Sequence, residues 1–140
     1  MTMIAAVERH PTPPVGDEKT QLLAWLDFYR ATLLNKCAGI PSSLLTARPI
    51  PSSQLTLLGL LRHMTVVEQS WFQRRMQGLA TAFSYDMSDD PDADFNDLTS
   101  AEISVVEANF HVAIATSREI ALRHSMDDIC LLYTSDAADE

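Results

Sequence analysis

Three long stretches of this sequence repeat their apolar residues at the spacing of a helix, and this pattern most constrains the fold. Apolar residues recur every three or four positions, and no stretch alternates between apolar and polar residues as a strand does. The pattern predicts an all-α fold built on three long amphipathic helices. Their stripes are Leu22, Leu23, Leu26, Tyr29, Leu33, Leu34 and Cys37; Leu57, Leu61, Met64, Glu68, Trp71 and Phe72; and Ile103, Val106, Phe110, Ile114, Ser117, Ile120, Ala121 and His124.

Residues that commonly begin and end helices mark the boundaries of these stretches, at about 17–38, 53–77 and 99–125. A short helical turn is expected at residues 42–47, between two proline-containing segments. The predicted helix starts are Asp17, either Ser52 or Ser53, and a capping box formed by Thr99 and Glu102; the predicted stops are Gly39 and Gly78.

The chain is long enough for one domain with a single core. Residues 1–15 are polar and rich in proline, so a flexible lead-in is expected there. Residues 16–129 are expected to form an incomplete helical bundle. Within it, residues 79–98 form a long acidic loop, and loops of this length in compact domains are usually either functional or loosely ordered.

The composition excludes several classes of protein. A formal net charge of −9 argues against nucleic-acid binding, which requires a basic surface. No apolar stretch reaches the roughly 20 residues of a membrane span. Two cysteines, Cys37 and Cys130, do not make a disulfide framework. The expected location is the cytoplasm.

The last eleven residues, 130–140, have an unusual sequence. CLLYTSDAADE resembles the translation of a transposon-end sequencing adapter along its whole length, so we expect a non-native tail. Cys130 is therefore expected to have no metal-binding or redox role. Three broad stripes usually need a fourth helix to close their core, and this tail is too short to supply one. The chain is expected to stop before that helix.

Three separated blocks, residues 8–40, 55–78 and 89–95, resemble one branch of the DinB/YfiT-like superfamily, mostly from bacteria that use mycothiol. The blocks read ERHPTPPVGDEKTQLLAWLDFYRATLLNKCAGI, LTLLGLLRHMTVVEQSWFQRRMQG and DDPDADF. The resemblance implies a DinB-like four-helix bundle of up-down-down-up type. It also implies a divalent metal, Zn or Ni, and thiol-dependent transfer or isomerisation.

Related proteins bind the metal through one histidine of the second helix and a histidine pair of the fourth. By this resemblance His63, in LRHMTVVE, is the metal ligand of the second helix. The histidine pair has no counterpart here, because the helix that would carry it is missing. One imidazole cannot hold such a metal alone. This chain is therefore expected to bind no metal and to be inactive as it stands.

Glu68 is the second candidate, because a carboxylate near the middle of an apolar helix face needs a partner. It is either a group that orients a metal-bound histidine or a general base, or it forms an ion pair with an arginine such as Arg30 or Arg62. The ion pair is slightly favoured.

Other chemical candidates are weaker. Glu107 and His111 are four residues apart on one helix and could chelate, but such pairs are common on helix surfaces. The aspartates of residues 86–97 lack the glycine and glutamate of a calcium loop, which favours a solvated acidic loop. Cys37 is expected to be a small core residue and His124 to cap the end of its helix.

Two functions from different classes follow. The first is that the parent protein is a metal-dependent enzyme acting on a small molecule with a low-molecular-weight thiol of the mycothiol type. The alternative is a non-catalytic helical module that binds a small molecule or forms a homodimer. Metal content of the full-length protein separates the two.

Overall fold

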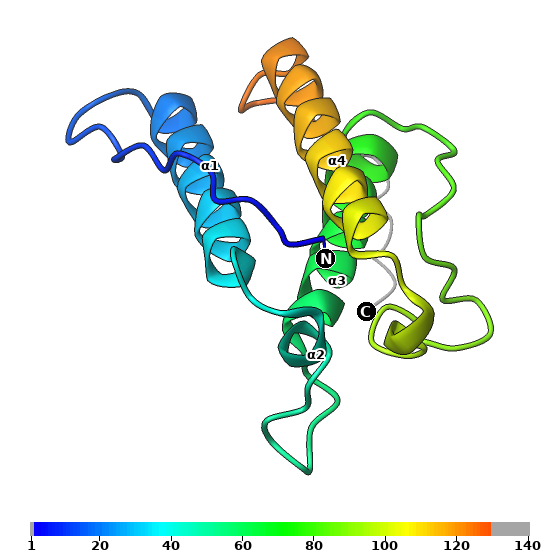
Figure 1. The fold of residues 1–140 in the computed structure, drawn as a ribbon. Helices are drawn as coiled ribbons and strands as arrows, with labels where there is room; N and C mark the ends of the chain where they lie inside the picture. Colours follow the sequence, from blue (N-terminus) through cyan, green and yellow to red (C-terminus); the bar gives the residue numbers. More distant parts are fainter. Residues whose placement is uncertain (1, 130–140) are drawn as a thin grey trace.

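The computed structural model describes residues 2–129 and has no strand within them, which confirms the all-α prediction. The predicted non-native tail, residues 130–140, lies outside the described residues. The three expected long helices and the short helical turn are present (Figure 1). The elements are α1 (Glu18–Cys37), α2 (Ser42–Leu45), α3 (Leu57–Glu68), which continues as the π-helix η1 (Gln69–Met76), the 3₁₀ turn η2 (Leu98–Ser100) and α4 (Ile103–Arg123).

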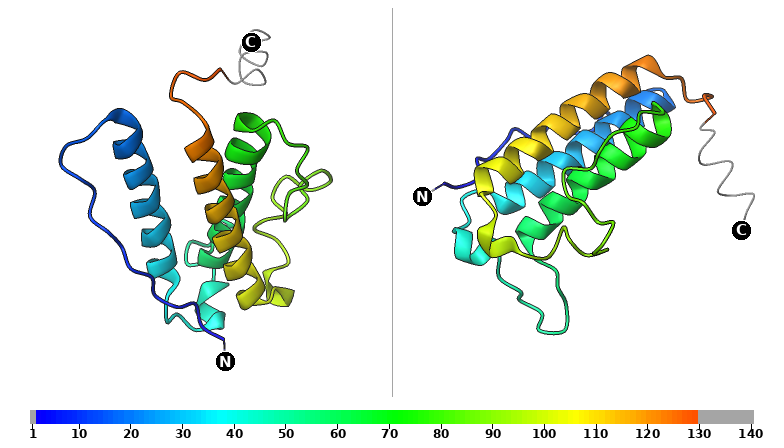
Figure 2. Two further views of the ribbon diagram at one scale, coloured as in Figure 1. Left: turned by 90° about the horizontal axis from the view of Figure 1, so that it is seen from above. Right: turned by 90° about the vertical axis from the view of Figure 1, so that its right-hand side faces the viewer.

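The long helices form a bundle in which α3 and α4 run parallel, side by side, and α1 runs in the opposite direction (Figures 1 and 2). The helix formed by α3 and η1 packs along α4, whereas α1 packs mainly against α3. The loop of residues 79–97 lies on the side of α3 away from α1 (Figure 1). No helix in the described residues is both long and apolar enough to cross a bilayer.

The ends of α1 lie where the sequence predicts them. The side chain of Asp17 accepts a hydrogen bond of 2.7 Å from the backbone N–H of Thr20, which satisfies a donor at the start of the helix. Gly39 has a φ of 68°, a left-handed conformation that glycine adopts without a Cβ clash. Its N–H donates to the carbonyl of Ile4 at 3.1 Å.

The predicted starts of the other two helices are wrong. Instead of Ser52 or Ser53, Thr56 caps α3: its buried Oγ1 accepts from the N–H of Gly59 at 2.9 Å. The predicted capping box of Thr99 and Glu102 does not form, because residues 98–100 make a 3₁₀ turn anchored by the buried Leu98. Glu102 is instead the N-cap residue of α4, and its side chain makes no capping hydrogen bond.

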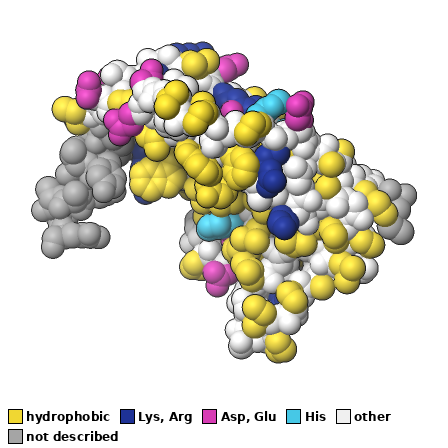
Figure 3. All heavy atoms as spheres, turned by 90° about the vertical axis from the view of Figure 1, so that its left-hand side faces the viewer, with side chains coloured by type: hydrophobic (Ala, Val, Ile, Leu, Met, Phe, Trp, Pro, Cys, Tyr) yellow, Lys and Arg dark blue, Asp and Glu magenta, His cyan; other side chains and the backbone are white. Residues whose placement is uncertain are grey.

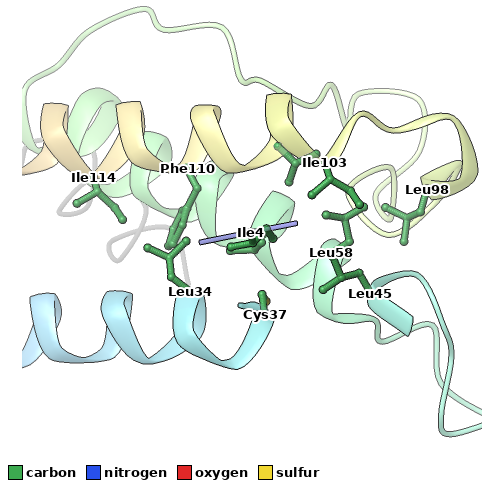
Figure 4. Close-up of a cluster of buried hydrophobic side chains, with 11 residues drawn as sticks. Ile4, Leu34, Cys37, Leu45, Leu58, Leu98, Ile103, Phe110 and Ile114 are labelled. Carbon is green, nitrogen blue, oxygen red and sulfur yellow. The ribbon is translucent and has the colours of Figure 1, made fainter. Parts of the chain in front are cut away.

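The core lies between the three long helices and is closed at one end by α2 (Figure 4). The predicted stripe of α4 faces it as expected, from Ile103 to Ile114. Cys37 is buried, as predicted, with 0% of its surface exposed. The core residues are Ile4, Leu34, Cys37, Leu45, Leu58, Leu61, Leu98, Ile103, Val106, Phe110 and Ile114.

The N-terminal segment crosses the bundle and contributes to this core. Ile4 is 2% exposed and lies near Leu34 and Phe110 (Figure 4). The backbone of Val7 exchanges two hydrogen bonds with the side-chain amide of Asn35, at 2.8 and 3.0 Å. The expected flexible lead-in therefore carries a core residue that sequence reasoning missed.

The first half of α1 departs from its predicted stripe. Leu22, Leu26 and Tyr29 were expected to face the core, but they are 47%, 37% and 63% exposed, and Trp25 beside them is 43% exposed. Only the second half of α1 reaches the core, through Leu34 and Cys37. Figure 3 shows hydrophobic side chains gathered on the α1 side of the molecule. The apolar surface of α1 is thus wider than its contact with α3 can cover.

Candidate functional site

His63 lies on α3 facing the acidic loop, where it contacts one buried carboxylate. Its Nδ1 is 2.6 Å from Oδ2 of Asp94. The side chain of Asp94 is 2% exposed, whereas that of His63 is 44% exposed. A carboxylate withdrawn from water needs such a partner, because an unpaired buried charge is costly. The pair therefore consists of a buried carboxylate and a solvent-accessible imidazole.

The residue before His63 fixes the loop on either side of Asp94. Arg62 donates from Nη1 to the carbonyl of Asn96 at 3.0 Å and from Nη2 to the carbonyl of Ala93 at 3.1 Å. Its guanidinium also lies over the ring of Tyr85, 4.4 Å from the centroid. Adjacent residues of α3 thus bind the backbone and the side chain of one short segment of the loop.

A glycine in α3 lets the loop approach this closely. Phe95 packs beside the ring of His63, with 5.6 Å between ring centroids. One turn before His63 on α3, a Cβ at position 59 would lie 2.4 Å from Cδ1 of Phe95, far inside van der Waals contact. Gly59 is therefore required by the space that Phe95 occupies.

The other acids of the loop mostly behave as the sequence predicts. Asp86, Asp89, Asp92 and Asp97 are exposed. Hydrogen bonds from the side chain of Asn96 and from a backbone N–H lower the pKa of Asp90. The expectation of a solvated loop is wrong for Asp94, which the sequence analysis counted among the solvated aspartates and which is 2% exposed.

Glu68 pairs with Arg30, which is the interpretation that the sequence slightly favoured. Nε and Nη2 of Arg30 each donate to one carboxylate oxygen of Glu68 at 2.7 Å, and both side chains are buried. Burial acts to lower the pKa of Arg30, but its bonds to Glu68 and Asp27 outweigh this and raise it. None of the hydrogen bonds of Glu68 links it to His63, so its role as an orienting group or a base stays a prediction.

Arg30 of this ion pair lines a cavity of about 410 Å³ between α1, α4 and the N-terminal segment. Asp27 bridges Arg30 and Arg118 there, with its Oδ1 3.0 Å from each. The cavity is also lined by Phe28 and His111. His63 does not line it, so the structure separates the predicted metal ligand from this charged groove.

The remaining candidates do not assemble a site. His111 and Glu107 are 3.9 Å apart on the surface of α4, and Glu107 also accepts from the backbone of Ala5. His124 contacts Gln77 and Asp128 rather than capping backbone carbonyls. Within residues 2–129, no three side chains of His, Cys, Asp or Glu are grouped closely enough to hold a metal.

The fold and these contacts define an all-α bundle of the DinB-like class. The family described as mycothiol-S-transferase matches residues 21–138, which is most of the chain. The chain therefore belongs to the mycothiol-S-transferase family. No curated protein and no solved structure matches it.

Proposed function

We propose that the protein is a metal-dependent thiol transferase in which His63 is a metal ligand. The observation that supports this is the contact of His63 with Asp94, because metal-binding histidines commonly donate their other ring N–H to a carboxylate. Membership in the mycothiol-S-transferase family supports a transfer reaction with a small thiol. A cytoplasmic location fits a thiol that must stay reduced.

Within residues 2–129, the side chains fit one ligand position of a metal centre and do not complete it. His63 offers one ligand, whereas a divalent metal with an open position needs about three from the protein. We propose that the others lie outside residues 2–129, on a fourth helix with two histidines four residues apart. The 140-residue chain alone should then be inactive.

The chemistry of the proposed transfer is a substitution at an electrophilic carbon. The thiolate forms a new S–C bond, the leaving group departs with the electron pair of its bond, and the thiol proton passes to solvent. A bound divalent metal would lower the pKa of the thiol and position its sulfur. His63 would hold the metal through one nitrogen, Asp94 contacts the other nitrogen and orients the ring, and Phe95 packs beside the ring.

The test uses the protein encoded by the intact gene, with mycothiol and a chromogenic alkyl halide as substrates. The wild-type protein should form the thioether faster than the uncatalysed reaction, and His63→Ala should reduce the rate to background. The exposed His111→Ala is the matched control and should keep the wild-type rate. Equal rates for wild type and His63→Ala would contradict the proposal.

The second candidate is the non-catalytic helical module, and the apolar face of α1 favours it. In that case Leu22, Trp25, Leu26 and Tyr29 would be covered by a second copy of the chain or by a small molecule. The intact protein would then contain no stoichiometric metal and would not accelerate the transfer. The two functions are therefore separated by the same preparation of protein.

A further inference from the structure

We infer that Asp94 is a positioning residue that fixes the tautomer of His63, so that the proton lies on Nδ1 and the lone pair on Nε2. That the group bound at Nε2 is a metal rests on the proposed function. The tautomer itself rests only on the contact between these two residues. Asp94 therefore acts through His63.

The position of the proton follows from the contact. Two electronegative atoms 2.6 Å apart share a proton, and an ionised carboxylate can only accept. Nδ1 of His63 must therefore donate to Oδ2 of Asp94. A neutral imidazole has one N–H, so Nε2 is left with its lone pair, the form that metals bind.

Hydrogen bonds to the loop backbone fix the position of Asp94 beside His63. The two bonds from Arg62 fix the carbonyls of residues 93 and 96, on either side of Asp94. Within the segment, the N–H of Phe95 donates to the carbonyl of Asp92 at 2.8 Å. Asp94 is also the buried acid of a loop whose other acids lie nearer the surface. Because Asp94 is out of water, its bond to His63 is strengthened by the low local dielectric.

The free side of the imidazole is accessible. The side chain of His63 is 44% exposed although its acid partner is 2% exposed. Nε2 of His63 makes no hydrogen bond to any of the described residues, while Nδ1 is occupied. The ring is thus anchored at one nitrogen and open at the other, an arrangement that a histidine serving only to stabilise the fold does not need.

The tautomer can be measured directly in the 140-residue chain by nitrogen NMR of ¹⁵N-histidine-labelled protein. The chain has four histidines, and His63→Gln identifies the signals of His63. At a pH where the imidazole is neutral, wild-type His63 should show a protonated Nδ1 and an unprotonated Nε2. Asp94→Asn should lose this preference and populate the Nε2–H form. Asp89→Asn, an exposed acid of the same loop, should leave it unchanged.

A wild-type His63 with its proton on Nε2 would overturn the inference even if Asp94→Asn failed to fold. An unchanged tautomer in a folded Asp94→Asn variant would overturn it as well. In the intact protein, titration with Co²⁺ alone should show an affinity about 10- to 100-fold weaker for Asp94→Asn. If Co²⁺ binds neither protein but the tautomer shifts as expected, the inference about Asp94 stands and the proposed function fails.

Discussion

Residue 59 is a glycine, and the ring of Phe95 occupies the space that a Cβ at this position would need. This absence of a side chain lets the acidic loop close against α3 next to His63. A glycine inside a helix costs about 1 kcal/mol relative to alanine. The close approach of Phe95 compensates for that cost with packing and with the contact between Asp94 and His63.

Replacing Gly59 with alanine tests this account. Overpacking costs about 1–3 kcal/mol and exceeds the gain in helix propensity, so Gly59→Ala should lower the free energy of unfolding. Urea unfolding followed by circular dichroism measures the change. At Gly16 an added Cβ would meet only ordinary contacts, and Gly16→Ala is the matched control. A Gly59→Ala variant as stable as the wild type would show that Phe95 is not held there.

Cys37 is a second position where burial sets the chemistry. Burial raises the pKa of its thiol to about 11, so the folded state retains the proton at neutral pH. An unfolded cysteine titrates at about 8.5. Only the unfolded state therefore releases the proton between about pH 8.5 and 11, and the stability contributed by Cys37 is lost as the pH rises through that range.

In a Cys130→Ser background, Cys37 is the one thiol of the chain. We expect a thiol reagent at pH 8 to modify it at the rate of unfolding, and denaturant to make it react at once. The time course of absorbance of a chromogenic disulfide reagent measures this. Rapid modification of the native protein at pH 8 would mean that Cys37 is a reactive thiol rather than a core residue.

At the scale of elements, one chain of charges joins the three long helices. Glu68 of α3 binds Arg30 of α1, and Asp27 of α1 binds Arg118 of α4. The link between Glu68 and Arg30 is buried, whereas the side chains of Asp27 and Arg118 are 44% and 54% exposed. Breaking a buried ion pair lowers the free energy of unfolding much more than breaking an exposed one.

Removing one partner of the buried pair should therefore be far more damaging than removing the exposed one. Glu68→Gln removes the buried charge partner of Arg30, leaving it only the half-exposed Asp27, and should cost about 3–5 kcal/mol. Arg118→Ala should cost less than about 1 kcal/mol. The double variant Arg30→Met, Glu68→Leu should recover most of the loss, because apolar side chains of similar size suit a buried site. Urea unfolding measures the free energy of unfolding of the three variants. An equal decrease for the two single variants would refute this account.

Periodicity also explains which elements were predicted well. The stripe of α4 packs against α3 and η1 along its length, so its pattern and its burial agree from Ile103 to Ala121. The stripe of α1 is as regular, but Leu22, Leu26 and Tyr29 in its first half are exposed. A pattern in sequence shows which face of a helix is apolar and does not show what covers it.

At the scale of the whole molecule, the sequence was sufficient for the fold class and the three long helices, whereas the role of His63 as a metal ligand stays a prediction. It was not sufficient for Asp94, which meets His63 across 31 positions and lies in a run of acids with no periodicity. It also missed Ile4, which lies in the short apolar run of residues 3–7 and was counted in the flexible lead-in. Contacts between isolated residues far apart in sequence leave no local pattern, so only the folded arrangement reveals them.

The helix starts were missed for a related reason. Ser52, Ser53 and Thr56 are all good capping residues, and local propensity does not choose among them. Thr56 caps α3 because it is 2% exposed, so that its hydroxyl finds its partner, the N–H of Gly59, inside the protein. Tertiary burial therefore decided a boundary that the sequence left open.

The central claim is that His63 binds a divalent metal, and metal analysis of the protein from the intact gene tests it most directly. Purified without chelators, the wild-type protein should contain about one equivalent of Zn or Ni, as a site of three protein ligands requires. His63→Ala should contain none, and His111→Ala should match the wild type. Wild-type protein without stoichiometric metal, or a His63→Ala variant that retains it, would contradict the account.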